Sequence, residues 1–169
     1  ETAEDARKVA PPENADLAFA TQTTLSVDDT AEIISILQFR FPEINGPRGE
    51  DICYATTNRQ NAVKHIAEHC DLVLVVGAEN SSNSKRLVEV ALRGGAKAGR
   101  LVADCDAIDW AEVDRAVHIG LSAGASAPES LVMEIIDEMR ERYDLQLDEN
   151  ALVEETLTFK LPAILTSEA

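Results

Sequence analysis

The fold is decided by the stretch Leu72-Val73-Leu74-Val75-Val76-Gly77-Ala78-Glu79-Asn80-Ser81-Ser82-Asn83-Ser84. Its first five residues are all apolar, without the alternation of a half-exposed strand, which predicts a strand that is covered on both faces. A turn rich in hydroxyl and amide side chains follows and leads into a predicted helix over residues 82–92, which ends at Gly94-Gly95. A buried strand, a short polar turn and a helix form the repeating unit of a parallel α/β sheet.

The same alternation continues on both sides of this stretch. We expect further helices over residues 3–9, 26–41, 58–69 and 126–142, and further strands over residues 17–21, 99–103, 116–121 and 156–161. The short links between them predict an α/β fold with a mostly parallel sheet and helices on both faces. The segment 43–51, which contains two glycines and a proline, is the expected domain boundary.

Composition argues against several classes of partner. The 169 residues include 31 acidic and 15 basic residues, giving a formal net charge of −16, and only 4% of the residues are aromatic. Such a surface repels phosphate backbones and anionic lipids and offers few rings for base stacking. We therefore expect no nucleic acid and no membrane partner. With three cysteines, no CxxC motif and no visible leader, the sequence favours a reducing, cytoplasmic location.

Four polar turns are candidates for an anion site, at residues 21–26, 53–58, 80–84 and 122–128. In a parallel sheet such turns share the carboxyl edge, and each precedes a helix amino terminus that attracts anions. The simpler interpretation of any one turn is helix capping, because Ser, Thr and Asn are the usual N-cap residues. Four together favour a shared site for a small anion such as a diphosphate. The absence of GxGxxG and of a P-loop lysine argues against a dinucleotide or nucleoside triphosphate.

The cysteines differ in their surroundings. Cys70 lies on the apolar face of a predicted helix and is expected to be core packing. Cys105 lies between two aspartates, which disfavour a thiolate, so we expect no chemical role for it. Cys53 lies in one of the hydroxyl-rich turns, where both a structural and a functional role remain open.

Four strings of residues resemble a known family when taken in order. They are Thr21-Gln-Thr-Thr-Leu-Ser-Val-Asp-Asp, Asp51-Ile-Cys-Tyr-Ala-Thr-Thr-Asn-Arg-Gln, Val75-Val-Gly-Ala-Glu-Asn-Ser-Ser-Asn-Ser and Gly124-Ala-Ser-Ala-Pro. They closely resemble the 4-hydroxy-3-methylbut-2-enyl diphosphate reductase (LytB) family over about residues 17–161. The resemblance implies an iron–sulfur oxidoreductase of non-mevalonate isoprenoid biosynthesis that removes a hydroxyl from an allylic diphosphate. In this family three α/β lobes surround a [4Fe–4S] cluster, and each lobe supplies one cysteine.

The resemblance also assigns roles to residues of this chain. Cys53 matches the cluster cysteine of the third lobe. Thr23 matches a catalytic, substrate-binding threonine near the substrate hydroxyl and its proton relay. The remaining matches are substrate-binding residues that hold the diphosphate, namely Ser81, Ser82, Asn83 and Ser126. Cys70 and Cys105 match no ligand of the family.

Much of the family pattern is missing from this chain. The resemblance implies that residues 1–48 are the end of the second lobe, residues 49–145 the third lobe and residues 146–169 a carboxyl-terminal extension. The other two cluster cysteines, the diphosphate-binding histidines and the proton-donating acid belong to the missing part. We expect the parent enzyme to use an electron donor such as ferredoxin or flavodoxin, and the chain alone to be inactive, since one thiolate does not hold a cubane cluster. A phosphate-binding module without redox chemistry and a purely structural fragment are the alternatives.

Overall fold

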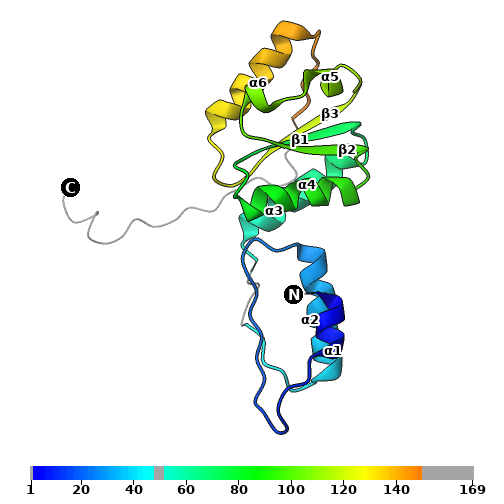
Figure 1. Ribbon diagram of the computed structural model, residues 1–169, viewed down its shortest axis with the longest axis vertical. Helices are drawn as coiled ribbons and strands as arrows, with labels where there is room; N and C mark the ends of the chain where they lie inside the picture. The colour runs from blue at the N-terminus through cyan, green and yellow to red at the C-terminus, as the bar shows by residue number, and fades with distance from the viewer. Residues whose placement is uncertain (1, 48–51, 150–169) are drawn as a thin grey trace, which may run out of the picture.

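The structure is a computed structural model that describes residues 2–47 and 52–149. Its helices are α1 (Ala3–Lys8), α2 (Val27–Arg40), α3 (Tyr54–Ala67), α4 (Ser82–Arg93), α5 (Trp110–Val113) and α6 (Glu129–Arg142). Its strands are β1 (Leu72–Val76), β2 (Ala98–Val102) and β3 (Ile119–Ala123), and one 3-10 turn, η1, covers Cys105–Ala107. We call residues 2–47 the amino-terminal body and residues 52–143 the main lobe; Figure 1 shows one above the other.

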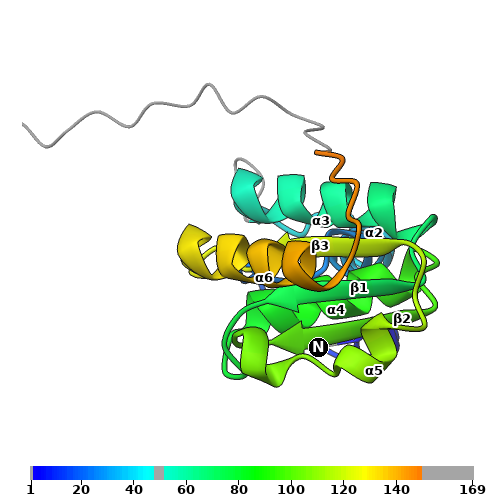
Figure 2. The same ribbon diagram turned by 90° about the horizontal axis from the view of Figure 1, so that it is seen from above.

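The main lobe is built on a three-stranded parallel sheet in the order β2-β1-β3. In the central strand β1, Val73 pairs with Gly99 of β2 on one side and with Gly120 of β3 on the other. Helices α3 and α4 lie on one face of this sheet, and α5 and α6 lie on the other (Figures 1 and 2). This arrangement confirms the predicted α/β class with a parallel sheet and helices on both faces.

Strand β1 is the centre of two hydrophobic clusters. Val73 and Val75 face α3 and α4, where they join a cluster that contains Val63, Ala67, Leu87, Val90 and Ala91. The alternate residues Leu72, Leu74 and Val76 face α5 and α6, in a cluster that contains Ile108, Val113, Ile135 and Met139. Each fully buried aliphatic side chain stabilises the fold by about 1.5–3 kcal/mol. The two clusters hold the carboxyl edge of the sheet in place.

The amino-terminal body consists of two helices and two extended segments. Helix α1 is fixed by a capping box between Thr2 and Asp5, and Arg40 of α2 donates to the carbonyl oxygens of Ala6 and Val9. The predicted strand at 17–21 is an isolated parallel bridge between Ala18 and Asn45, not a strand. A single bridge forms because the described residues bring no further strand alongside it.

Two predicted helix starts are wrong. Helix α3 begins at Tyr54 instead of residue 58, because the carbonyl of Cys53 already accepts from the N–H groups of Thr56 and Thr57. Helix α6 begins at Glu129 instead of residue 126. Pro128 is its N-cap, and the residue before a proline is disfavoured in helical conformation.

Smaller differences concern the strands and the end of the chain. Strand β2 begins one residue earlier than predicted and β3 three residues later. The sequence predicted neither η1 nor α5. The predicted strand at 156–161 lies outside the described residues. Within the described ranges no helix has the length and apolar character needed to cross a bilayer.

Candidate functional site

The amino terminus of α4 carries three of the predicted binding residues. Ser81 is the N-cap, and its Oγ accepts from the backbone N–H of Ser84 at 3.2 Å. Ser82 is exposed, whereas Asn83 is buried, with 7% of its surface exposed. Neither the oxygen nor the nitrogen of the Asn83 amide has a hydrogen-bond partner among residues 2–47 and 52–149. Since buried amides are nearly always paired in folded proteins, this one is available to a ligand.

Two glycines let α4 approach the sheet edge closely. Gly77 follows β1 and Gly124 follows β3, and the Gly124 N–H donates to the carbonyl of Val76 at 2.8 Å. A Cβ atom at Gly77 would lie 2.2 Å from Ser84 Oγ, and one at Gly124 would lie 2.1 Å from the same oxygen. The first turn of α4 is therefore packed on the backbone of both strand ends.

Ser126 lies in the turn that begins at Gly124. The Ala127 N–H donates to the Gly124 carbonyl at 3.0 Å and closes this turn, and Ser126 is exposed on it. Ser126 does not cap α6, because the N-cap of that helix is Pro128 and no side chain in the described structure makes a cap hydrogen bond there. Since Gly124 contacts Ser84, the Ser126 turn and the amino terminus of α4 are neighbours at the carboxyl edge of the sheet, as the sequence predicted.

Cys53 is the N-cap of α3 and is an exposed, free thiol. Its Sγ lies 3.0 Å from the Oγ1 of Thr56. This hydrogen bond lowers the pKa of Cys53, with smaller contributions from the backbone N–H groups of Thr56 and Ala55 and from Arg59, while partial burial opposes them. A thiolate is the form of cysteine that binds metals, so the position favours a ligand role.

Helices α3 and α4 run parallel, and this brings Cys53 and Ser81 to the same edge. The two helices end together, because a Cβ at Gly94 would lie 3.1 Å from the Cβ of Ala67 and 3.4 Å from the Cα of Lys64. Their lengths are similar, 14 and 12 residues. Both amino termini, with their partial positive charges, therefore point to the carboxyl edge of the sheet.

Thr23 lies in an exposed turn of the amino-terminal body that is attached to α3. The attachment is the side chain of Gln60, which is completely buried. Its Oε1 accepts from the Val27 N–H at 3.0 Å, and its Nε2 donates to the Leu25 carbonyl at 2.8 Å. An ion pair of 2.7 Å between Lys64 and Asp28 lies beside it. The helix that begins at Cys53 thus also carries the contact to the Thr23 turn.

The other two cysteines belong to the hydrophobic core. Cys70 is half-buried beyond the opposite end of α3, and burial, followed by the charge of Asp71, raises its pKa. Cys105 packs on the α6 side of the sheet, and burial, followed by four nearby carboxylates, raises its pKa. No cluster of three or more potential metal ligands exists in the part of the chain that the structure describes.

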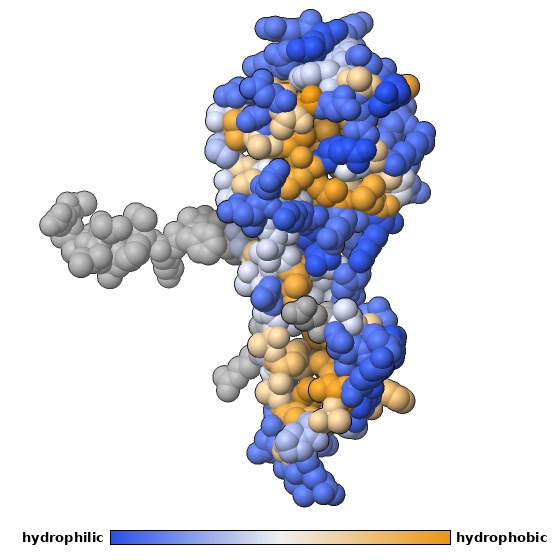
Figure 3. Space-filling model, in the orientation of Figure 1, coloured by the Kyte–Doolittle hydropathy of each residue, from blue (hydrophilic) through white to orange (hydrophobic). Residues whose placement is uncertain are grey.

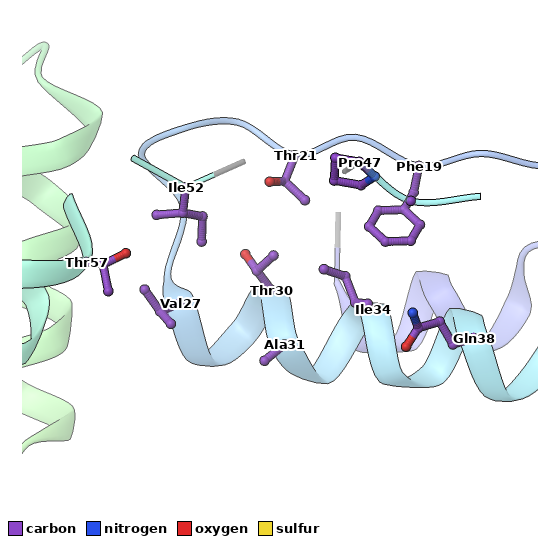
Figure 4. A pocket seen from close by; sticks show the side chains of 11 residues that line it. Phe19, Thr21, Val27, Thr30, Ala31, Ile34, Gln38, Pro47, Ile52 and Thr57 are labelled. Atoms are coloured by element: carbon purple, nitrogen blue, oxygen red, sulfur yellow. The ribbon is translucent and has the colours of Figure 1, made fainter. Parts of the chain in front are cut away.

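A cavity of about 410 Å³ lies between α2, the extended segments of the amino-terminal body and the start of the main lobe, a region that the sequence did not point to. Its lining is shown in Figure 4 and comprises Phe19, Thr21, Val27, Thr30, Ala31, Ile34, Gln38, Gly46, Pro47, Ile52 and Thr57. Figure 3 shows apolar surface exposed on the same body. The sequence does indicate the face of α2 that lines this cavity, because positions 27, 31, 34 and 38 have helical spacing and lie on one side of the helix.

Sequence reasoning also missed the residues that support the site. Ser84, Gly77 and Gln60 received no role, although each has a sequence signal. Gly77 directly follows the buried strand, and Ser84 follows the N-cap Ser81 by three residues. Gln60 is a polar residue on the face of α3 that also buries Val63 and Ala67.

Fold and site together define a class: a parallel α/β protein in which two helix amino termini and a glycine-containing turn meet at the carboxyl edge of the sheet. A family model described as LytB protein matches residues 1–140. The chain belongs to the LytB family.

Relatives named 4-hydroxy-3-methylbut-2-enyl diphosphate reductase support this membership. The protein of that name from Hyphomonas neptunium is 56% identical over 165 residues, which cover 98% of this chain and 52% of the relative. The one from Agrobacterium fabrum is 58% identical over 159 residues, covering 94% and 46%. The solved E-1-hydroxy-2-methyl-but-2-enyl-4-diphosphate reductase of Plasmodium falciparum superposes with a TM-score of 0.86 at 34% identity, covering 99% of this chain and 53% of that structure. The chain spans about half the length of the relatives that it matches.

Proposed function

We propose that this protein is the carboxyl-terminal part of a 4-hydroxy-3-methylbut-2-enyl diphosphate reductase, an oxidoreductase that forms isopentenyl and dimethylallyl diphosphate. In this part, the amino terminus of α4 binds the substrate diphosphate and Cys53 provides one ligand to an iron–sulfur cluster. The observation that carries the proposal is the family match over residues 1–140. The gathering of the α3 and α4 amino termini at one edge supports it.

This part of the enzyme contributes uncharged groups to the diphosphate site. The first N–H groups of α4 and the helix dipole attract anions, and Ser81 and Ser82 add hydroxyls. The unpartnered amide of Asn83 and the exposed hydroxyl of Ser126 extend the site to the neighbouring turn. A local site of this kind is needed because the net charge of −16 repels an anion at long range.

The surroundings of Cys53 fit a cluster ligand. Its thiol is exposed, and its pKa is lowered by the hydrogen bond to Thr56. Cys70 and Cys105 do not fit, because burial raises the pKa of both. The remaining ligands would come from the amino-terminal half that the relatives possess, and a bound [4Fe–4S] cluster would supply electrons and a Lewis acid. Thr23 would hold a proton near the substrate hydroxyl.

The complete enzyme implies partners and a location. We propose that the amino-terminal half packs on the apolar cavity beside α2, since the chain has only half the length of its relatives and leaves this face uncovered. A ferredoxin or flavodoxin would donate electrons, in the cytoplasm, where thiols stay reduced.

The test is to co-express the chain with the amino-terminal half of the Hyphomonas neptunium relative and to reconstitute the pair anaerobically with iron and sulfide. We expect cluster absorbance and reduction of the allylic diphosphate. Cys53→Ser should abolish both, while the matched variant Cys70→Ser should retain both. A pair that folds but shows neither property, or that is indifferent to Cys53→Ser, contradicts the proposal.

A binding module without redox chemistry is the second candidate. It is favoured by one observation: the described residues alone form the α4 site, with the buried, unpartnered amide of Asn83 in it. This function predicts that the reconstituted pair binds pyrophosphate without showing cluster absorbance and that Cys53→Ser changes nothing in it.

A further inference from the structure

We propose that Ser84 is a positioning residue that fixes the hydroxyl of Ser81 as a hydrogen-bond donor and thereby selects an anionic ligand. The inference rests on the proposed diphosphate site and adds a residue to it. Ser84 itself is fully buried and contacts no ligand space, so it acts through Ser81.

The two serines are joined by two hydrogen bonds. Ser84 donates to Ser81 Oγ with its backbone N–H at 3.2 Å and with its own hydroxyl at 2.9 Å. A serine hydroxyl has two acceptor lone pairs and one proton. Because Ser84 occupies both lone pairs, the proton of Ser81 is the one hydrogen-bonding function left for a ligand.

This arrangement discriminates between ligands by their chemistry. An ionised phosphate offers acceptors alone, so it matches a hydroxyl that can only donate. A ligand that must donate a hydrogen bond to Ser81, or a cation that needs its lone pairs, finds them occupied. Ser84 therefore restricts the Ser81 hydroxyl, which could otherwise donate or accept, to donating a hydrogen bond to a ligand.

The surroundings of Ser84 keep its hydroxyl in place. Gly77 and Gly124 enclose this oxygen so closely that a Cβ at either position would lie about 2 Å from it, at 2.2 and 2.1 Å. A larger side chain than serine does not fit between the two strand ends, and alanine fits but has no proton to donate. The two glycines and Ser84 thus act as one unit.

The experiment is a double-mutant cycle with pyrophosphate as the probe, measured by calorimetry on the whole chain. Ser84→Ala is compatible with a helix and should leave thermal unfolding nearly unchanged. We expect Ser81→Ala to weaken binding by about tenfold and Ser84→Ala by about fivefold. The double variant should bind no more weakly than Ser81→Ala, because Ser84 acts only through Ser81.

Ser126→Ala provides the matched control. It should weaken pyrophosphate binding independently, so that its effect multiplies with that of Ser84→Ala. If Ser84→Ala weakens binding equally in the wild-type and Ser81→Ala backgrounds, the positioning role is overturned.

A second measurement needs no ligand and separates this inference from the proposed function. NMR couplings between the α and β protons of Ser81 should report one side-chain rotamer in the wild type and more averaging in Ser84→Ala, where only the backbone N–H of residue 84 still donates to Ser81 Oγ. An unchanged rotamer overturns the positioning role. A wild-type chain that has this rotamer but binds no pyrophosphate contradicts the diphosphate site instead.

Discussion

Gln60→Leu tests how the two parts of the molecule are joined. The Gln60 amide binds the backbone on both sides of Ser26, through the Leu25 carbonyl and the Val27 N–H. Leucine has nearly the same volume but neither hydrogen-bonding group. We expect the substitution to detach the start of α2 from α3 and to leave the sheet of the main lobe intact.

The magnitude follows from the bonds that are lost. Each neutral hydrogen bond contributes about 1 kcal/mol net, and partly buried backbone groups left without partners add a further cost, so about 2–3 kcal/mol is expected. The ion pairs Lys64–Asp28 and Arg93–Asp29 also link the two parts, but their side chains are largely exposed. Such pairs contribute about 0.2–1 kcal/mol each and do not replace the buried amide.

Hydrogen exchange followed by mass spectrometry measures the effect locally. A loss of 2–3 kcal/mol accelerates exchange about 30- to 150-fold, and we expect this in peptides covering residues 27–40 and not in those covering β1. Lys64→Met is the control, because it removes the Lys64–Asp28 ion pair beside Gln60 and leaves the buried amide in place, so its effect should be smaller. Equal acceleration in both regions, or none in residues 27–40, would refute the reasoning.

Three further predictions concern single contacts. Thr56→Val should raise the pKa of Cys53, since it removes the hydrogen bond that lowers it, and the pH midpoint of iodoacetamide alkylation should move upward. Gly124→Ala should lower the melting temperature, because its Cβ would collide with Ser84 Oγ; overpacking of this kind costs about 1–3 kcal/mol. Asp71→Asn should reduce the fall in the free energy of unfolding at low pH. Hydrogen bonds, first from Lys97, hold the pKa of Asp71 well below its usual range, so the stabilisation by Asp71 is present above the unfolded-state pKa and disappears as pH falls through the folded-state pKa. Urea unfolding at several pH values measures this change.

The fold of the main lobe could be predicted because its decisive signals are local. Five consecutive apolar residues from Leu72 to Val76 mark a central strand, and the Gly94-Gly95 pair ends the next helix. The start of α3 was misplaced because Thr56 and Thr57 are typical of turns and strands when read locally. In the structure the N–H groups of both residues bind the carbonyl of Cys53, and the helix begins there.

The residues of the candidate site could be predicted from the polar turns that contain them, but the residues that hold these side chains in place could not. Ser81, Asn83 and Ser126 follow strands, and parallel strands end at one edge. That Ser84 lies between Gly77 and Gly124 depends on how closely α4 approaches two strands, which no spacing along the chain reveals. The partner of Gln60 lies 35 residues away at Leu25, so its role too became visible only in three dimensions.

Helix α3 connects the parts of the proposed site. Its amino terminus presents Cys53, its second turn holds the Thr23 turn through Gln60, and its far end packs against the end of α4 at Gly94. A shift of α3 along its axis would therefore move the proposed cluster ligand, proton-holding residue and diphosphate-binding helix together. Helix α3 carries Cys53 as its N-cap and contacts the Thr23 turn and α4 through buried side chains. The geometry among the three therefore depends on one helix, and the exposed ion pairs contribute little to it.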